Sequence, residues 1–581
     1  MVETDGDNVV LHDFSWTYDA KDNVTALTES IGGKSFSYTY AYDDDSRPTT
    51  FGYGDVTEQI TYDGHGRSSG TTVKNGSRTV LGTGYAYRDV DSTYTTTQVK
   101  SVTNSYGGKT ANFNYTYDAS GNITSISGAQ AVTYEYDDLG QLVWEKNATA
   151  GKAWNYTYDN GGNILSRTEY TCSGNGTVSG GGTTTSYTYG DAEWGDLLTA
   201  YNGEEITYDG IGNPLSYRGW TMSWQGGRQL ASMTKGSDTI SFAYNESGLR
   251  TSKTVNGVAH SYVWQGSKLA ADITDAYALY FHYDSTGDVI GFTRTANGTD
   301  TEYFYVKNFQ GDILKVITAT GTEAATYTYD AWGKLLTSSG DMADVNPLRY
   351  RGYYYDVETG LYYLQSRYYD PGTCRFINPD AFATTDADGI LSANMFAYCE
   401  NNPVRNTDIT GAIGVGTLIR AATGAVTSLI SGIAAGDRGV ELLVDVGVGA
   451  LSSALNTPLA SAAVAAYDAY KCYRDGVSIE GCVIVFVSEF AASFVSGGSF
   501  KNGFFGKGIW DELGKAAFDL SIGFAVNFTA SQVSTNVAEN LYMTESTPGG
   551  KSSNQRASNL AYIEPVQVMH YGGGTWRMVT R

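Results

Sequence analysis

Apolar and polar residues alternate in short stretches from Asp5 to about Gly340, and each stretch ends in turn-forming residues. Residues 113–118 read Phe-Asn-Tyr-Thr-Tyr-Asp, so their three aromatic side chains would lie on one face of a β-strand. Asp118 and Gly121 then supply a tight turn, because Asp hydrogen-bonds its own backbone and Gly adopts positive φ. Ile123 begins the returning strand. The pattern predicts an antiparallel β-hairpin.

The same unit, Tyr-x-Tyr-Asp followed by two or three residues and Gly, recurs about every 20 residues. Clear copies end at Asp118, Asp137, Asp159 and Asp330, and shorter ones at Asp19, Asp43, Asp63, Asp209 and Asp284. Other copies keep the aromatic residue and lose the Asp, as at Tyr87, Tyr189, Trp224, Tyr244, Trp264 and Tyr305. Because one hairpin cannot bury its own face, the copies are expected to pair laterally into a long coiling sheet.

Residues 347–411 form a denser stretch, rich in Tyr and Arg, that interrupts the repeat. We expect this stretch to plug and terminate the repeat array. Its arginines Arg349, Arg351, Arg367 and Arg375 are expected to stack and pair among the tyrosines inside the plug.

From Ala412 onward the composition shifts to Ala, Gly, Val and Ser, and the repeat stops. The weakly charged runs at 421–436 and 446–467 predict helices with small packing faces. Residues 446–467 are long enough to span a bilayer, but Ser452, Asn456 and Pro458 interrupt them. A helical bundle, or a segment that inserts into membranes conditionally, is favoured over a permanent anchor. The predicted domains are therefore a repeat shell (1–340), a core domain (341–411) and a small, mainly α module (412–581).

Composition narrows the classes of function. The chain has 581 residues with Gly 70, Tyr 46 and Pro 9, which favours short strands and tight turns. The formal net charge of -24 argues against nucleic-acid binding by the shell. Five scattered cysteines and five distant histidines predict no disulfide framework, no metal site and no cofactor. The acidic start lacks an apolar stretch, so no signal peptide is predicted. The chain is interpreted as the C-terminal part of a longer array, or as a short relative that begins within the array.

The Tyr-x-Tyr-Asp-x-x-Gly units resemble the YD-repeat arrays of Rhs proteins, Tc toxin C subunits and teneurins. The following stretch is similar to the Rhs repeat-associated core domain, on residues 349–356, 360–363, 366–372, Arg375-Phe376, Asp380, Asn394, Tyr398, Asn401-Asn402-Pro403, Asp408 and Gly411. The resemblance implies a mainly β fold, in which hairpins coil into a hollow cocoon that the core closes. It also implies a variable C-terminal toxin held inside as a partner of its own shell.

In that family the core is an intramolecular aspartyl protease. Carried over, the resemblance makes Asp380 and Asp408 the catalytic carboxylates, with Arg375 or Arg367 in support, and the Ala412-Ile413 bond the cleavage site. Two such carboxylates would split their pKa values, so that one activates water and the other protonates the leaving amine. Ile409 and Ala412 depart from the family pattern, which has Pro and Leu there. The alternative is that both aspartates only cap turns.

The leading functional hypothesis is a polymorphic toxin, secreted or at the cell surface, that presents a C-terminal effector and is matched by an immunity protein. No recognisable catalytic set occurs in residues 412–581, so membrane perturbation is one candidate activity. The alternatives are a non-enzymatic surface adhesin that binds glycans, and an inactive fragment of an Rhs protein.

Overall fold

The computed structural model describes residues 2–4, 10–21, 23–89, 95–380, 394–411, 570–572 and 575–577. The chain divides into two compact units, Met1–Asn456 and Thr457–Arg581. In the second unit, β37 (His570–Gly572) pairs antiparallel with β38 (Thr575–Arg577). The helices predicted within residues 412–581 lie outside the described residues.

The described residues of the first unit are mainly antiparallel strands, and within each sheet a strand pairs with the next one along the chain. The first sheet has 18 strands: β1 (Val2–Thr4), β2 (Val10–Tyr18), β3 (Val24–Ile31), β4 (Lys34–Tyr42), β5 (Pro48–Tyr53), β6 (Val56–Tyr62), β7 (Ser68–Asn75), β8 (Arg78–Asp89), β9 (Thr95–Tyr106), β10 (Lys109–Tyr117), β11 (Ile123–Gly128), β12 (Val132–Tyr136), β13 (Leu142–Asn147), β14 (Lys152–Tyr158), β15 (Ile164–Cys172), β16 (Val178–Thr188), β17 (Ala200–Tyr201) and β18 (Glu204–Glu205).

The second sheet has 14 strands: β19 (Thr207–Tyr208), β20 (Pro214–Tyr217), β21 (Trp220–Gln225), β22 (Gln229–Lys235), β23 (Asp238–Tyr244), β24 (Arg250–Val255), β25 (Val258–Gln265), β26 (Lys268–Ile273), β27 (Ala278–Tyr283), β28 (Val289–Ala296), β29 (Thr299–Lys307), β30 (Ile313–Thr318), β31 (Glu323–Tyr329) and β32 (Leu335–Ser339). These two sheets are called the wall below. The expectation of a mainly β fold with large antiparallel sheets is confirmed.

The predicted repeat turn recurs in the wall with one geometry. After β10, the Asp118 carboxylate accepts the backbone N–H of Asn122 at 2.8 Å, and Gly121 has a φ of +82°. The turns that begin at Asp137, Asp159 and Asp209 show the same carboxylate-to-backbone bond. The register shifts at the tyrosine that ends β10, which marks a β-bulge next to the turn. Asp and Gly therefore act as the sequence predicted.

The second aromatic residue of each unit links one hairpin to the one before it. The Tyr117 hydroxyl donates to the Val99 carbonyl at 2.7 Å, and the Trp224 indole N–H donates to the Pro214 carbonyl at 2.7 Å. Equivalent bonds run from Tyr42, Tyr62, Tyr87, Tyr136, Tyr158, Tyr189, Tyr208, Tyr244, Trp264, Tyr283 and Tyr329. Tyr and Trp are both acceptable at this position because each combines a flat apolar ring with one donor.

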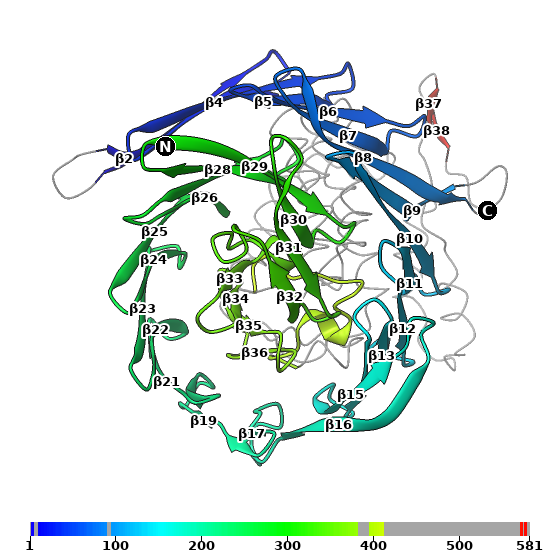
Figure 1. The fold of residues 1–581 in the computed structure, drawn as a ribbon, viewed down its shortest axis with the longest axis vertical. Coiled ribbons are helices and arrows are strands. Elements are labelled where there is room, and N and C mark those ends of the chain that lie inside the picture. Colours follow the sequence, from blue (N-terminus) through cyan, green and yellow to red (C-terminus); the bar gives the residue numbers. More distant parts are fainter. Residues whose placement is uncertain are drawn as a thin grey trace, which may run out of the picture. The chain divides into compact units, whose positions relative to one another are not determined.

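Within the first unit, the wall curves around four short inner strands, and its last strands pass beneath its first ones (Figure 1). Here β3 to β6 pack on β27 to β29, a contact that we call the seam. Its apolar part includes Phe51, Tyr53 and Phe304. Its polar part is also buried: the Tyr53 hydroxyl donates to Glu302 at 3.2 Å, and the Tyr38 hydroxyl lies 3.0 Å from His282 Nδ1.

Two carboxyl groups buried at the seam predict a stability that falls with pH. Burial raises the pKa of Glu29 to about 7 and that of Glu58 to about 8, against 4.5 for both unperturbed groups. Between about pH 4.5 and pH 8 the folded seam therefore holds protons that the unfolded chain has lost, so stability decreases as pH rises through this window. Urea unfolding should give a lower midpoint at pH 8.5 than at pH 5.5.

The Glu58→Gln variant should lose part of this slope, on the order of 2 kcal/mol across the window, because it no longer ionises. Glu193→Gln, at an exposed position, is the matched control and should keep the slope of the unmodified chain. Equal slopes in all three proteins would contradict the assignment of the slope to Glu58.

Candidate active site

Residues 347–411, called the core segment, fold inside the curve of the wall (Figure 1). They form a 3₁₀ turn η1 (Tyr350–Gly352), then β33 (Tyr354–Asp356), β34 (Leu361–Tyr363), β35 (Tyr368–Asp370) and β36 (Arg375–Phe376), and a second 3₁₀ turn η3 (Cys399–Asn401). Tyr362, Tyr369 and Tyr398 are completely buried, and the rings of Tyr369 and Tyr398 stack with their centroids 4.0 Å apart. The core segment is therefore a packed aromatic plug.

Asparagines of the core segment bind the turns of the wall. The Asn401 amide donates to the Gly162 carbonyl at 2.7 Å, and the Asn402 amide donates to the Gly140 carbonyl at 2.8 Å. Asn402 also donates to the side-chain oxygen of Asn122, the residue that completes the turn after Asp118. Three successive repeats thus present polar groups to one loop, which holds the core segment in a fixed position in the wall.

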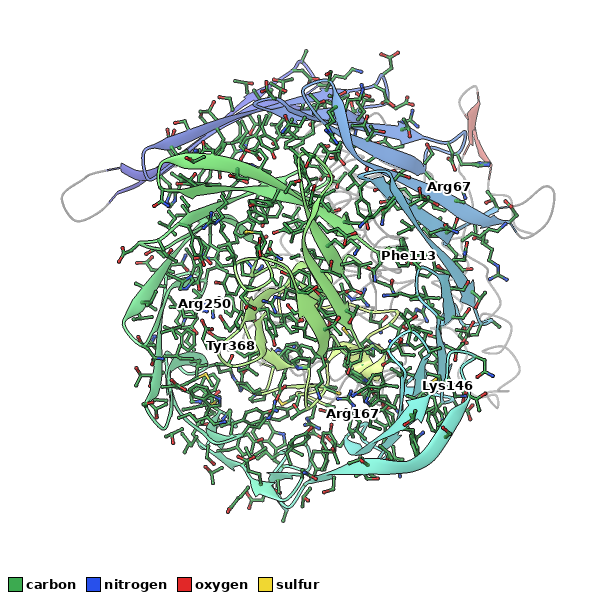
Figure 2. All side chains as sticks on the ribbon, viewed as in Figure 1. Arg67, Phe113, Lys146, Arg167, Arg250 and Tyr368 are labelled. Atoms are coloured by element: carbon green, nitrogen blue, oxygen red, sulfur yellow. The ribbon has the colours of Figure 1, made fainter. Side chains whose placement is uncertain are left out.

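A completely buried ion pair between wall and core segment joins Arg250 to Asp356. Arg250 Nη1 lies 2.8 Å from the Asp356 carboxylate, and Lys253 Nζ lies 2.9 Å from it. Arg250 also lies against five aromatic rings, those of Phe242, Tyr262, Tyr354, Tyr363 and Tyr368. Figure 2 labels Arg250 on the wall and Tyr368 on the core segment that faces it. Burial acts to raise the pKa of Asp356, but Arg250 and Lys253 lower it below its usual value.

The structure brings Asp380 and Asp408 together around Arg367. Arg367 Nη2 lies 2.9 Å from Asp380 Oδ2 and 3.2 Å from Asp408 Oδ2. Arg367 immediately precedes β35, Asp380 follows β36, and Asp408 follows η3, so three separate parts of the core segment converge on one guanidinium. The Arg367 guanidinium also stacks on the Phe376 ring, 3.5 Å from its centroid. Two carboxylates and one shared cation form the candidate site.

The two carboxylates occupy a nearly dry environment. Asp408 is 0 % exposed, and burial raises its pKa to about 6. The Arg367 guanidinium opposes this rise, and the charge of Asp380 adds to it. Burial also lowers the pKa of Arg367 itself. A carboxyl group that titrates near neutral pH, next to a second carboxylate, suits general acid–base chemistry.

The chain that leaves the site is held at its last described residues. The Ser366 hydroxyl donates to the Thr410 carbonyl at 2.8 Å, and Arg367 Nε donates to the Gly411 carbonyl. Gly411 has a φ of +68°, and a Cβ on it would meet the Leu364 carbonyl oxygen at 2.5 Å, so only glycine fits. Ala412 and Ile413, the predicted cleavage residues, lie outside the described residues. The backbone that leads to them starts beside the carboxylate pair.

Of the two arginines that the resemblance offered as support for the carboxylates, Arg375 binds wall residues. Its guanidinium donates to Asn163 Oδ1 at 3.1 Å, to the Tyr189 hydroxyl at 2.6 Å and to the Asp196 carbonyl at 2.6 Å. These partners belong to the wall, so Arg375 ties β36 to the repeat turns, whereas Arg367 contacts the two carboxylates. Arg250 could not be singled out from the sequence. Its repeat unit has Asn245 in place of the Asp, and no nearby residue indicates that Arg250 pairs with Asp356.

Neither a metal site nor a membrane-spanning helix occurs among the described residues. No group of three or more His, Cys, Asp or Glu side chains among them could hold a metal ion. No helix in this part of the chain is long and apolar enough to cross a membrane.

Comparison with known proteins identifies the family. The family model described as Teneurin YD-shell matches residues 3–151, 59–218 and 132–404, well over half of the chain. The tRNA3(Ser)-specific nuclease WapA of Bacillus spizizenii is 38% identical over 222 residues, which cover 37% of this chain and 9% of that protein. The tRNA(Glu)-specific nuclease WapA of Bacillus subtilis subsp. natto is 31% identical over 316 residues, which cover 52% of this chain and 11% of that protein.

Double-stranded DNA deaminase toxin A of Burkholderia cenocepacia is 25% identical over 344 residues, which cover 52% of this chain and 22% of that protein. This chain therefore spans less than a quarter of the length of these three relatives. Among solved structures, the crystal structure of TcdB2-TccC3-Cdc42 is similar with a TM-score of 0.51 and 16% identity, over 69% of this chain and 25% of that chain. At that identity the likeness concerns the fold alone. With its wall of repeat hairpins around an aromatic core segment, this chain belongs to the Teneurin YD-shell family, the Rhs/YD-repeat proteins.

Proposed function

We propose that this chain is the shell part of an Rhs-type polymorphic toxin, secreted or at the cell surface, which encloses residues 412–581 as its effector. Support comes from the family match, which ends at residue 404, and from the change in composition after Gly411. The relatives carry toxin or nuclease names with different activities, tRNA cleavage and DNA deamination. Similarity in the shell therefore does not name the activity of the effector.

The core segment is proposed to release the effector by hydrolysing the Ala412-Ile413 peptide bond. The observation that carries this proposal is the convergence of Asp380 and Asp408 on Arg367. The ionised carboxylate would take a proton from water while the water oxygen attacks the Ala412 carbonyl carbon. The protonated carboxyl would give its proton to the Ile413 nitrogen as the C–N bond breaks, leaving a carboxylate and an amine.

Intact-mass analysis of the purified full chain tests this proposal. The unmodified protein should yield two fragments that break at the Ala412-Ile413 bond. Asp380→Asn and Asp408→Asn should each remain full-length, with cleavage slowed by about 1,000-fold or more, because each variant lacks one partner of the acid–base pair. Asp344→Asn is the matched control, since its side chain in the same part of the chain is 84% exposed.

Two further outcomes decide the proposal. Both fragments should elute together in native buffer and separate in denaturant if the shell encloses its effector. A single full-length species from the unmodified chain under all conditions between pH 4 and pH 9 would remove autoproteolysis from the proposed function.

A further inference from the structure

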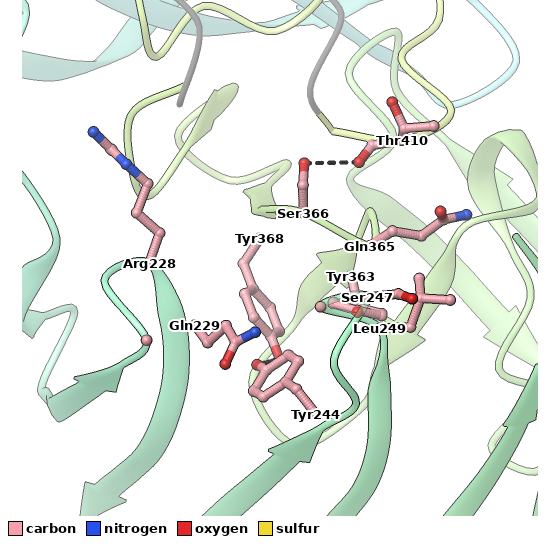
Figure 3. Close-up of a pocket in the computed structure, with 12 residues that line it drawn as sticks. Arg228, Gln229, Tyr244, Ser247, Leu249, Tyr363, Gln365, Ser366, Tyr368 and Thr410 are labelled. Atoms are coloured by element: carbon pink, nitrogen blue, oxygen red, sulfur yellow. Dashed lines mark hydrogen bonds between the residues drawn. The ribbon is translucent and has the colours of Figure 1, made fainter.

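A cavity of about 310 Å³ lies where the wall meets the core segment, and Ser366, the neighbour of Arg367 in the chain, lines it. On the wall side it is bounded by Arg228 and Gln229, from the turn between β21 and β22, and by Leu249 before β24. On the other side lie Ser366 and Thr410, the pair that holds the outgoing chain. Figure 3 shows Arg228 at the left, on the wall, with its guanidinium pointing away from Gln229 and Tyr244, and the Ser366–Thr410 bond at the upper right.

Arg228 contacts the backbone that carries one of the two carboxylates. Its Nη1 donates to the Pro379 carbonyl at 2.9 Å, and Asp380 is the next residue. The charge of Arg228 also lies close enough to Arg367 to lower the pKa of that guanidinium. Arg367 contacts both carboxylates, and Arg228 of the wall contacts the backbone one residue before Asp380.

We propose that Arg228 is a positioning residue of the cleavage site: its hydrogen bond to the Pro379 carbonyl fixes the backbone from which the Asp380 carboxylate projects. The inference rests on the proposed autoproteolysis. Arg367, Asp380 and Asp408 all belong to the core segment, whereas Arg228 belongs to the wall. The rate of cleavage therefore depends on whether the wall has docked on the core segment. Cleavage of the effector is then slow until β21 and β22 have closed around the core segment.

The dependence on the wall has a physical basis. A charge-assisted hydrogen bond to a backbone carbonyl fixes the position of the following side chain. Misplacement of a catalytic group by about 1 Å can reduce a rate on the order of 100-fold. The chain would therefore cleave slowly while the β21–β22 turn is undocked, and rapidly once Arg228 reaches Pro379.

The test compares Arg228→Gln and Arg228→Lys with the unmodified full chain. Each protein is refolded at a series of pH values between pH 4 and pH 9, and the rate of fragment formation is measured at each value. Arg228→Gln should cleave on the order of 100-fold more slowly, and Arg228→Lys should recover part of the rate. Loss of a nearby cation disfavours ionised carboxylates, so the alkaline limb of the pH profile should move upward by about one unit in Arg228→Gln.

Among the described residues, the Tyr353 hydroxyl and the Cys399 thiol also lie near Asp408. Burial raises the pKa of each of them well above its usual value, so both stay neutral across the range and do not contribute to the limb. Arg47→Gln is the control. Arg47 lies in an equivalent turn of the wall and pairs with Asp43, so this variant should cleave like the unmodified chain.

The outcomes separate the inference from the proposed function. If the unmodified chain cleaves and Arg228→Gln cleaves at the same rate with the same pH profile, the positioning role is wrong. If Arg228→Gln is slower but its pH profile is unchanged and Arg228→Lys gives no recovery, Arg228 has only a structural role and the inference is also overturned. If the unmodified chain never cleaves, the proposed function fails first, and the inference fails with it.

Discussion

Replacing Arg250 with methionine is expected to destabilise the first unit by about 3–5 kcal/mol, because the buried Asp356 carboxylate then loses one of its two cationic partners. Arg250 is 1% exposed and forms a two-pronged ion pair with Asp356, at 2.8 and 3.1 Å. Methionine fills a similar volume but provides no donor. Lys253 remains 2.9 Å from Asp356, so part of the charge compensation survives.

Urea unfolding of the unmodified and Arg250→Met proteins measures this effect. The midpoint should fall strongly, and an Arg250→Met/Asp356→Asn double variant should recover part of the loss, because the buried charge is then gone. Arg47→Met is the matched control: its pair with Asp43 is partly exposed to solvent, so the change should stay within about 1 kcal/mol. Equal midpoints for the Arg250 and Arg47 variants would contradict a stabilising role for the buried ion pair between Arg250 and Asp356.

Replacing Gly333 with alanine is expected to have the second large effect, a loss of roughly 2–5 kcal/mol. Gly333 ends a repeat turn with a φ of +83°, where an L-residue costs about 1–2 kcal/mol. A Cβ there would also meet the Tyr350 ring at 2.4 Å, and Tyr350 is buried in the core segment. Overpacking of this kind costs typically 1–3 kcal/mol more.

Gly140 offers a matched control for Gly333. It occupies the same place in its own turn with a φ of +79°, but a Cβ on it meets no atom within 4 Å. Gly140→Ala should therefore lose only the conformational part, and the difference in urea midpoint between the two variants measures the clash with Tyr350. Two variants of equal stability would show that the core segment moves away from the wall at little cost.

The local structure of the wall could be read from the sequence because its determinants lie within a few residues of one another. Asp118 and Gly121 make their turn with bonds that span four residues, and the alternation in residues 113–117 sets which face is buried. The same reasoning predicted a mainly β fold with large antiparallel sheets. The core segment could be recognised from its dense Tyr and Arg content, and the family resemblance drawn from it is confirmed.

The arrangement of the candidate site could only be partly predicted. The resemblance singled out Asp380, Asp408, Arg367 and Arg375, and it left open which arginine accompanies the carboxylates. In the structure, Arg367 lies between Asp380 and Asp408, and Arg375 donates to Asn163, 212 residues away along the chain. No local pattern carries that choice, because it depends on the direction in which each side chain leaves a packed core.

The sequence by itself therefore determined the hairpin unit, its period and the position of the core segment, since period-2 alternation and turn chemistry act over short distances. Only the tertiary structure decided how the wall closes at the seam, why Arg250 is buried against Asp356, and that Arg228 reaches Pro379 from the wall. Each of these contacts joins residues more than 100 positions apart. Which residues meet in these contacts depends on the curvature of the wall and on the burial of charge. Neither property can be read from a stretch of neighbouring residues.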